Sequence, residues 1–272
     1  MPLKSRKYVN DLTVLKLYSS GENGEKKLKL VCMKSCRVSG VEDENEKKGS
    51  KKGSKNDAKM KESLCRARTR IFELAFCNPW EWFFTATLDP SKYDRTDLEK
   101  FHEDFTQFIR NYNRKHKLDV KFLMIPERHS DGVSWHMHGF LMGLPVDHLH
   151  QFQIGDKMSD KLAQKVKNGE TIYNWIDYLS RFGFCDLEPI RSHEAVSKYV
   201  TKYISKDLAN SVTELNAHLY YRSRGLNGAV EIARGFLQAG TLQEPSYSGE
   251  YASVWWLDYS DELKNKLIES II

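Results

Sequence analysis

Two histidines separated by a single residue, His136 and His138, lie within an apolar run that is typical of a β-strand. Residues two apart in a strand point to the same face, so both imidazoles are expected to project together. Glu127 ends the preceding apolar run and could add a carboxylate across a hairpin. Two imidazoles and a carboxylate form a divalent-metal site, and one with open positions suits Mg²⁺ or Mn²⁺ that polarises a phosphate. Packed or hydrogen-bonded histidines without a metal are the alternative.

The same spacing recurs at His148 and His150, which provide an internal comparison. This second pair follows Pro145, at what the sequence predicts to be the start of a helix. Side chains two residues apart in a helix diverge, so the sequence favours a surface position for this pair and no metal site.

Two tyrosines four residues apart, Tyr199 and Tyr203, occur where the sequence predicts a helix, so they share one helical face. Lys198, Lys202 and Lys206 form a neighbouring row. A phenol with a pKa of about 10 is a poor nucleophile at neutral pH, but a metal-bound phosphate and nearby ammonium groups favour the phenolate. Lys202 and Lys206 could also neutralise a scissile phosphate or a leaving oxygen. An amphipathic helix with tyrosines in the core is the alternative.

Three segments in this order resemble the HUH endonuclease superfamily, specifically the replication initiators of the rolling-circle type. Phe83–Asp89 is similar to the first family motif, a hydrophobic strand with Thr-x-Thr, although Ala86 is a mild departure. His136-Met137-His138 is similar to the second motif, and Lys198–Lys206 to the third motif of two-tyrosine phage initiators of the gene II and gene A type. The resemblance covers about residues 66–208.

The resemblance implies a reaction and a set of catalytic residues. A tyrosine attacks a phosphodiester of single-stranded origin DNA, present as a hairpin or melted, to form a 5′-phosphotyrosyl bond and a free 3′-hydroxyl. The second tyrosine could then cleave the regenerated origin and rejoin the strands. The nucleophiles are Tyr199 and Tyr203, with Tyr203 slightly favoured for the first attack because some initiators keep only that tyrosine.

The resemblance also implies the metal ligands. His136 and His138 match the family's two histidine ligands, with Mg²⁺ or Mn²⁺ as the cofactor. Glu127 is the expected third ligand, and His129 or Asp131 could take its place, because family members vary at this position.

The order of strands and helices predicts an α+β fold with a central antiparallel sheet, flanking helices and an N-terminal β-hairpin extension. The resemblance makes this the HUH, ferredoxin-like fold. We expect a β-hairpin segment over residues 1–40, a flexible charged linker over 41–60, the nuclease domain over 61–210 and a C-terminal extension of uncertain role over 211–272.

Within the nuclease domain, the pattern of apolar residues predicts helices and strands at defined places. Helices are expected at about 59–77, 98–112 and 192–208, strands at 82–88, 120–125, 135–142 and 183–190, and a less regular helical stretch at 146–181.

Positive charge is concentrated near the N-terminus. Residues 1–70 hold 19 Lys/Arg and 9 Asp/Glu, a net charge of +10, whereas the rest of the chain carries −5. This asymmetry is typical of a basic arm or face for a polyanion, or else of a solvated tail. We expect DNA contacts from six basic residues: Arg66, Arg68, Arg70, Lys198, Arg222 and Arg224.

Several classes of protein do not fit the sequence. No run approaches the roughly 18 apolar residues of a membrane span, and no signal-peptide pattern is present. With 5 scattered cysteines, reduced thiols in a cytoplasmic protein are expected, without a membrane partner. No Walker P-loop occurs, so a replication initiator of this kind would need a separate helicase and polymerase from the host.

Three alternatives remain from the sequence. A transposase or mobilisation relaxase would use the same chemistry for another purpose. A DNA-binding regulator would keep the fold without cutting, and would bind through phosphate contacts and base stacking. A metallohydrolase that activates water would leave the paired tyrosines without a role.

Overall fold

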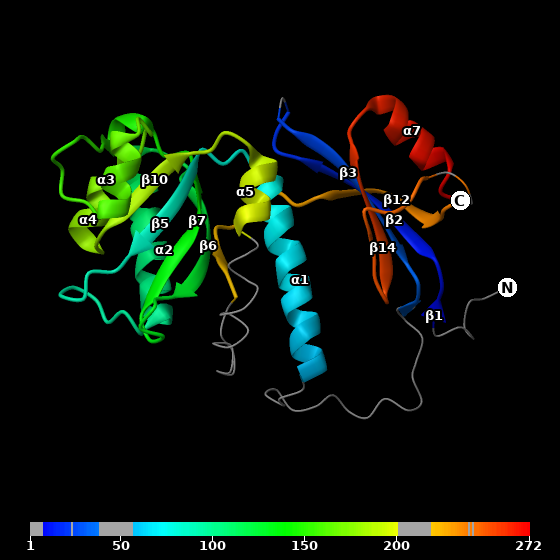
Figure 1. Cartoon of the computed structure of the whole chain (residues 1–272), viewed down its shortest axis with the longest axis horizontal. Helices are drawn as coiled ribbons and strands as arrows, with labels where there is room; N and C mark the ends of the chain where they lie inside the picture. Colours follow the sequence, from blue (N-terminus) through cyan, green and yellow to red (C-terminus); the bar gives the residue numbers. More distant parts are fainter. Residues whose placement is uncertain (1–7, 23, 38–56, 201–218, 239, 241) are drawn as a thin grey trace. The chain divides into compact units, whose positions relative to one another are not determined.

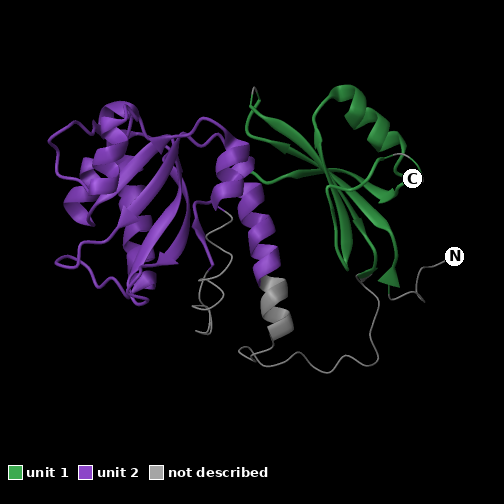
Figure 2. Cartoon of the chain, viewed as in Figure 1, with its two compact units in different colours: residues 1–55, 227–272 green, residues 56–226 purple. Residues whose placement is uncertain are grey.

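The computed structural model describes residues 8–22, 24–37, 57–200, 219–238, 240 and 242–272, with side chains from residue 64 onward in the first helix. The chain divides into two compact units, shown in different colours in Figure 2. One unit combines residues 1–55 with 227–272, and the other spans 56–226. The second unit contains all of the predicted metal ligands.

Seven antiparallel strands form the sheet of the second unit. In spatial order they are β11 (Tyr221–Arg222), β6 (Lys121–Arg128), β7 (Trp135–Met142), β5 (Trp82–Thr87), β10 (Cys185–Pro189), β9 (Tyr173–Asn174) and β8 (His150–Gln151). The strand with the two histidines, β7, is therefore central and has a partner on each side.

The β6–β7 hairpin turns at Asp131, whose carboxylate accepts hydrogen bonds from the backbone N–H groups of Val133 and Ser134 at 2.9 and 2.8 Å. An aspartate that holds its own turn in this way is a common loop device. The Arg128 guanidinium stacks over the Trp135 ring, 3.7 Å from its centroid, at the point where the two strands meet the turn. These contacts fix the register of the two strands that hold the predicted metal ligands.

One face of the sheet carries a large aromatic core. Helix α2 (Leu98–His116) begins at the Asp97 cap and presents its apolar stripe to this face. The short helix α4 (Ile176–Arg181) contributes Tyr178 to the same core. Phe105 lies at its centre, fully buried and in contact with six other aromatic rings.

The opposite face is only partly apolar. Helices α1 (Asp57–Phe76) and α5 (His193–Val200) contact each other and pack over part of it, as Figure 1 shows beside β6. Their buried residues Ile71, Leu74 and Val200 lie in one cluster with Leu123 and Phe140 of the sheet. The rest of this face bears polar side chains, described in the next subsection.

The stretch 146–181 is less helical than the sequence predicts. It holds α3 (Asp160–Lys167) and α4, but also a 3₁₀ turn (Val146–His148) and the two short strands β8 and β9. The strands form because Tyr173 and His150 extend the sheet through β10, and such long-range pairing overrides local helical preference.

In the part of the first unit that the structure describes, a five-stranded antiparallel sheet is accompanied by helix α7 (Asp261–Glu269). In spatial order its strands are β12 (Val230–Phe236), β2 (Leu12–Ser19), β3 (Lys26–Met33), β14 (Ala252–Asp258) and β13 (Tyr247–Ser248). Helix α7 packs Leu267 against Leu15, Leu28 and Leu30 of the sheet. Strands β1 (Tyr8–Val9) and β4 (Cys36–Arg37) form a separate two-stranded sheet in this unit. The hairpin expected within 1–40 and the segment expected as a C-terminal extension thus share one sheet.

The predicted α+β class, with a central antiparallel sheet and flanking helices, is confirmed. Within the described residues no helix has the length and apolar character needed to cross a membrane.

Phe105→Ala is expected to destabilise the second unit by about 3–5 kcal/mol, because a fully buried phenyl ring leaves a cavity that its neighbours fill only in part. Chemical denaturation followed by circular dichroism measures the loss. Gln107→Ala, on the exposed side of the same helix, is the control and should change stability by less than about 0.5 kcal/mol. Equal effects of the two substitutions would contradict the described core.

Candidate metal centre and polar trough

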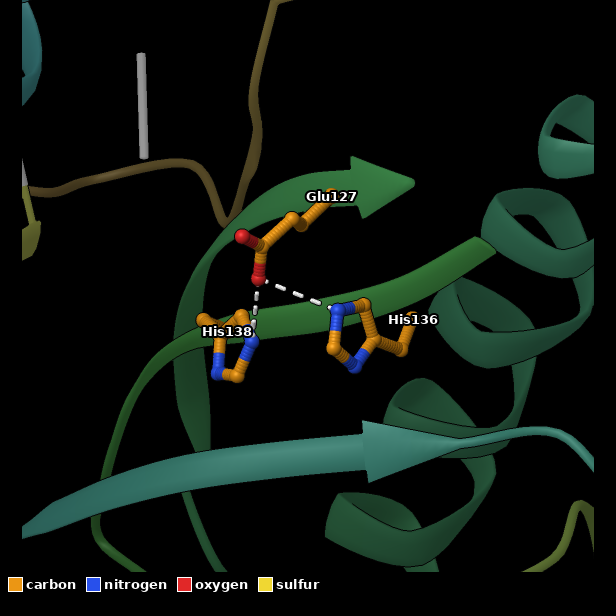
Figure 3. Close-up of side chains that lie close together, drawn as sticks. All are labelled: Glu127, His136 and His138. Carbon is orange, nitrogen blue, oxygen red and sulfur yellow. Dashed lines mark ion pairs between the residues drawn. The ribbon is translucent and has the colours of Figure 1, made fainter. Parts of the chain in front are cut away.

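Glu127, His136 and His138 converge on one point of the sheet, as Figure 3 shows. The Glu127 Oε2 atom lies 3.0 Å from His136 Nε2 and 2.8 Å from His138 Nε2. The strand register explains this: Glu127 pairs with His136 across β6 and β7, and His138 is two residues further along the same face. Among the described residues, these three form the group of metal-binding side chains whose ligand atoms converge.

The spacing of the three side chains fits a divalent ion. Two ligand atoms at right angles around an ion at about 2.1 Å lie about 3 Å apart, close to both contacts of Glu127 Oε2. The donor set of two imidazoles and one carboxylate leaves room for other ligands. His129 lies beside the group, its ring 4.4 Å from that of His136, whereas Asp131 is engaged in the turn.

The electrostatics of the group favour the protonation states that a metal requires. Burial lowers the pKa of His138, against the opposing effect of Glu127, so its imidazole is neutral near pH 7. Burial alone would raise the pKa of Glu127, but hydrogen bonds with the two histidines outweigh it and lower that pKa to about 2. Neutral histidines and an ionised carboxylate are the forms that bind metal.

A hydrogen-bonded chain on the neighbouring strands reaches the other side of His138. Thr85 of β5 pairs with His138 of β7, and its Oγ1 lies 3.4 Å from His138 Nδ1. Thr85 also bonds to the Asp186 carboxylate on β10. In the tautomer that would bind a metal through Nε2, Nδ1–H of His138 donates to Thr85, which in turn donates to Asp186. The metal would then replace the Nε2 proton through which His138 bonds to Glu127 without a metal.

Gly139 makes the close packing beside His138 possible. A Cβ atom at this position would lie 1.9 Å from the backbone oxygen of Leu123 on β6. Only glycine therefore allows β6 and β7 to approach at this point, one residue after the buried ligand.

His136 and His138 line a cavity of about 270 Å³, called the trough from here on. Glu127 contacts both histidines but does not itself line the trough. The floor of the trough is the polar part of the sheet. One wall is helix α5, and the other is helix α3 together with its N-cap residue Ser159. The residues lining the trough are Phe83, Thr85, His136, His138, Ser159, Lys161, Leu162, Lys165, Asp186, Glu188 and Tyr199.

Tyr199 brings one of the two predicted nucleophiles to the trough. It lies in the last turn of α5, which Val200 anchors in the core. The Tyr199 ring contacts Phe83 edge-on at 5.7 Å, and Phe83 in turn stacks on His138 at 6.2 Å. With 45% of its surface exposed, Tyr199 is not a core residue, so the core-tyrosine alternative does not describe it.

The opposite wall comes from α3, a part of the chain that the sequence did not single out. Ser159 caps this helix by accepting from the Leu162 backbone N–H at 3.3 Å, and Leu162 anchors it in a small apolar cluster. Lys165 forms an ion pair with Glu188 at 2.8 Å. The alternation of residues along β10 could have predicted that Asp186 and Glu188 share one face of the strand. It could not have predicted that α3 lies beside that face.

The other predicted site residues lie elsewhere. Tyr203, Lys202 and Lys206 are outside the described residues. Lys198 is exposed on α5 and pairs with Glu194 at 2.7 Å.

The five arginines predicted to contact DNA do not line the trough. Arg66 and Arg68 are exposed on α1, and Arg70 pairs with Glu73 at 3.0 Å. Arg222 and Arg224 are exposed at and just after β11.

The second histidine pair diverges, as expected, but only half of it is on the surface. His148 is partly buried and its Nδ1 lies 2.5 Å from the Tyr112 hydroxyl. His150 is exposed, and its Nε2 lies 2.9 Å from the Asp156 carboxylate. The surface assignment was wrong for His148 because the 3₁₀ turn directs it onto α2.

Residues 81–208 match the model of the family described as Replication-associated protein ORF2/G2P. The match supports a rolling-circle replication-initiator family and covers β5, the β6–β7 hairpin, α3 and α5. No curated protein and no solved structure matches the chain.

Asp186→Asn is expected to stabilise the protein above about pH 6 and to have little effect in acid. Burial raises the pKa of Asp186 from 3.8 to about 6, so the folded protein retains a proton that the unfolded chain loses. Stability from this protonated carboxyl is complete below a pH of about 3.8 and is lost as the pH rises through about 6. The amide has no charge to bury and still accepts from Thr85.

Thermal midpoints measured across this pH range test the expectation. Glu103→Gln removes the same charge from an exposed position on α2 and is the matched control. The difference between the Asp186→Asn and wild-type midpoints should grow with pH, whereas the control difference stays constant. Parallel curves for Asp186→Asn would refute the raised pKa.

Proposed function

We propose that this chain is a replication-initiator endonuclease that nicks single-stranded origin DNA with tyrosine as the nucleophile. The observation that carries the proposal is the trough, which brings Tyr199 to the same cavity as His136 and His138, the two histidines that Glu127 contacts. The match to a replication-associated family over the same residues supports it.

The reaction is a transesterification in which atoms and electrons balance. The Tyr199 hydroxyl, or that of Tyr203, loses its proton and attacks the phosphorus of a phosphodiester. The new bond joins the phenolic oxygen to phosphorus, and the bond from phosphorus to the 3′ oxygen breaks. The 3′ oxygen takes up a proton to give the hydroxyl that a polymerase extends, while the 5′ phosphate stays on tyrosine. The reverse reaction rejoins strands.

Glu127, His136 and His138 would hold a Mg²⁺ or Mn²⁺ ion, whose role when bound is to withdraw charge from the phosphate oxygens. Thr85 and Asp186 act through His138, because their hydrogen bonds fix the ring and direct Nε2 to the site. Phe83 holds the Tyr199 ring beside His138. A tyrosine that is half exposed on a wall of the trough can reach a phosphate on its floor.

A covalent adduct tests the proposal directly. Wild-type protein, labelled single-stranded DNA from candidate origins and Mn²⁺ are expected to give a slowly migrating protein–DNA band on a denaturing gel. EDTA and His136→Ala should abolish the band, as should Tyr199→Phe combined with Tyr203→Phe. The single tyrosine variants identify the first nucleophile.

The outcomes separate the remaining alternatives. Tight binding without an adduct, unaffected by the tyrosine substitutions, would identify a DNA-binding regulator. Metal-dependent cleavage without an adduct would identify a hydrolase that uses water. Activity on transposon ends rather than on a replication origin would assign the same chemistry to transposition.

Glu127→Gln is expected to weaken Mn²⁺ binding at least tenfold, about 1.4 kcal/mol, because a neutral amide replaces the charged ligand at nearly the same size. Isothermal titration calorimetry on the full chain measures the affinity. Glu81→Gln, which replaces a glutamate outside the converging group of Glu127, His136 and His138, should bind Mn²⁺ like the wild type. Unchanged affinity in Glu127→Gln would exclude Glu127 as a ligand.

A further inference from the structure

The wall of the trough opposite Tyr199 carries a positive charge to which no role has been assigned. Lys161 lies in the first turn of α3 and lines the trough together with His136, His138 and Tyr199. Its side chain is exposed, and it forms no ion pair or hydrogen bond with the residues that the structure describes. Lys161 is therefore a cation available to a ligand in the trough.

The other lysine of this wall is already engaged. Lys165, one turn further along α3, is held by Glu188 on the floor at 2.8 Å. Burial works against its charged form, but the Glu188 hydrogen bond and charge prevail and raise the pKa of Lys165. The Lys165–Glu188 pair thus connects α3 to β10 and fixes the position of the helix that presents Lys161.

The positive charge of Lys161 affects two groups on the floor of the trough, His138 and Asp186. It contributes to lowering the pKa of His138, after the larger effect of burial. It also opposes the burial that raises the pKa of Asp186. A ligand between Tyr199 and α3 would experience this field at short range, where screening by salt is incomplete.

We propose that Lys161 binds a backbone phosphate of the DNA strand next to the scissile one, so that α3 forms the strand-positioning wall of the trough. This inference rests on the proposed function. A strand whose scissile phosphate lies between Tyr199 and the histidine pair must leave the trough past one of its walls, and α3 supplies the cation on that side. Lysine suits this task because its ammonium group acts as a point charge toward phosphate.

This role concerns positioning and binding, not bond breaking. A phosphate contact is independent of sequence, so it can be measured without knowledge of the origin. The probe is a fluorescent, mixed-sequence single-stranded oligonucleotide of about 20 nucleotides, longer than a typical single-strand site of ~4–16. Cleavage is blocked by Tyr199→Phe with Tyr203→Phe, and anisotropy in Mn²⁺ gives Kd over a range of salt concentrations.

Lys161→Ala in this background is expected to weaken binding roughly threefold to tenfold and to reduce the slope of log Kd against log salt by about 0.7, the contribution of one phosphate contact on a single strand. Lys161→Arg should restore the slope. Lys167→Ala, on the same helix but outside the trough, is the control and should change neither quantity.

Two results would overturn the inference: equal salt slopes for Lys161→Ala and Lys167→Ala, or no binding of the probe by the parent protein at any salt concentration. The adduct assay with wild-type protein reports separately on the proposed function. An adduct with unchanged slopes refutes the role of Lys161 and leaves the nuclease in place. A reduced slope with no adduct from any origin leaves a strand-binding trough without tyrosine chemistry.

Discussion

The pairing of three strands, β6, β7 and β5, is the constraint on which the rest of the site depends. Their register places Glu127 opposite His136 and Thr85 opposite His138. A shift of one residue in either pairing would point the two histidines toward the aromatic core and Met137 toward the trough. Gly139 permits the close approach of β6 at this point, and the turn at Asp131 holds the hairpin in register. The geometry of Glu127, His136 and His138 is therefore a property of backbone pairing, not of flexible loops.

The unequal faces of the sheet explain how a polar site persists on a buried element. The α2 face is apolar throughout and provides most of the packing. The other face is covered by α1 and α5 over β6 and by α3 near β10, so the polar strip between the helices remains open. Helix α5 serves both purposes, because Val200 lies in the core while the adjacent Tyr199 faces the trough. Stability and chemistry are thus divided between the faces of one sheet.

Local patterns in the sequence predict the α2 helix and the shared face of His136 and His138, because spacing of two in a strand and of three and four in a helix follows from backbone geometry alone. The hairpin between Glu127 and His136 is also local. The roles of Asp186 and Lys161 could not be predicted in this way, since they require β10 to pair with β5 and α3 to cover that edge. The shared sheet of the first unit is equally non-local: β2 and β12 pair across most of the chain.

Negative charge lies on the floor of the trough, whereas positive charge lies on the wall that α3 forms. Asp186 and Glu188 place carboxylates on the floor, Glu127 contacts the two histidines that line it, and Lys165 is paired with Glu188. A phosphodiester on this floor would lie near the Asp186 carboxylate, and among the lining residues Lys161 is the lysine without a described ion pair. The proposed metal offsets Glu127 and its surroundings at the point of cleavage, whereas Lys161 acts at the edge where the strand leaves. DNA binding in the trough should therefore be linked to occupancy of the metal site, since two like charges in one small cavity repel unless a cation separates them.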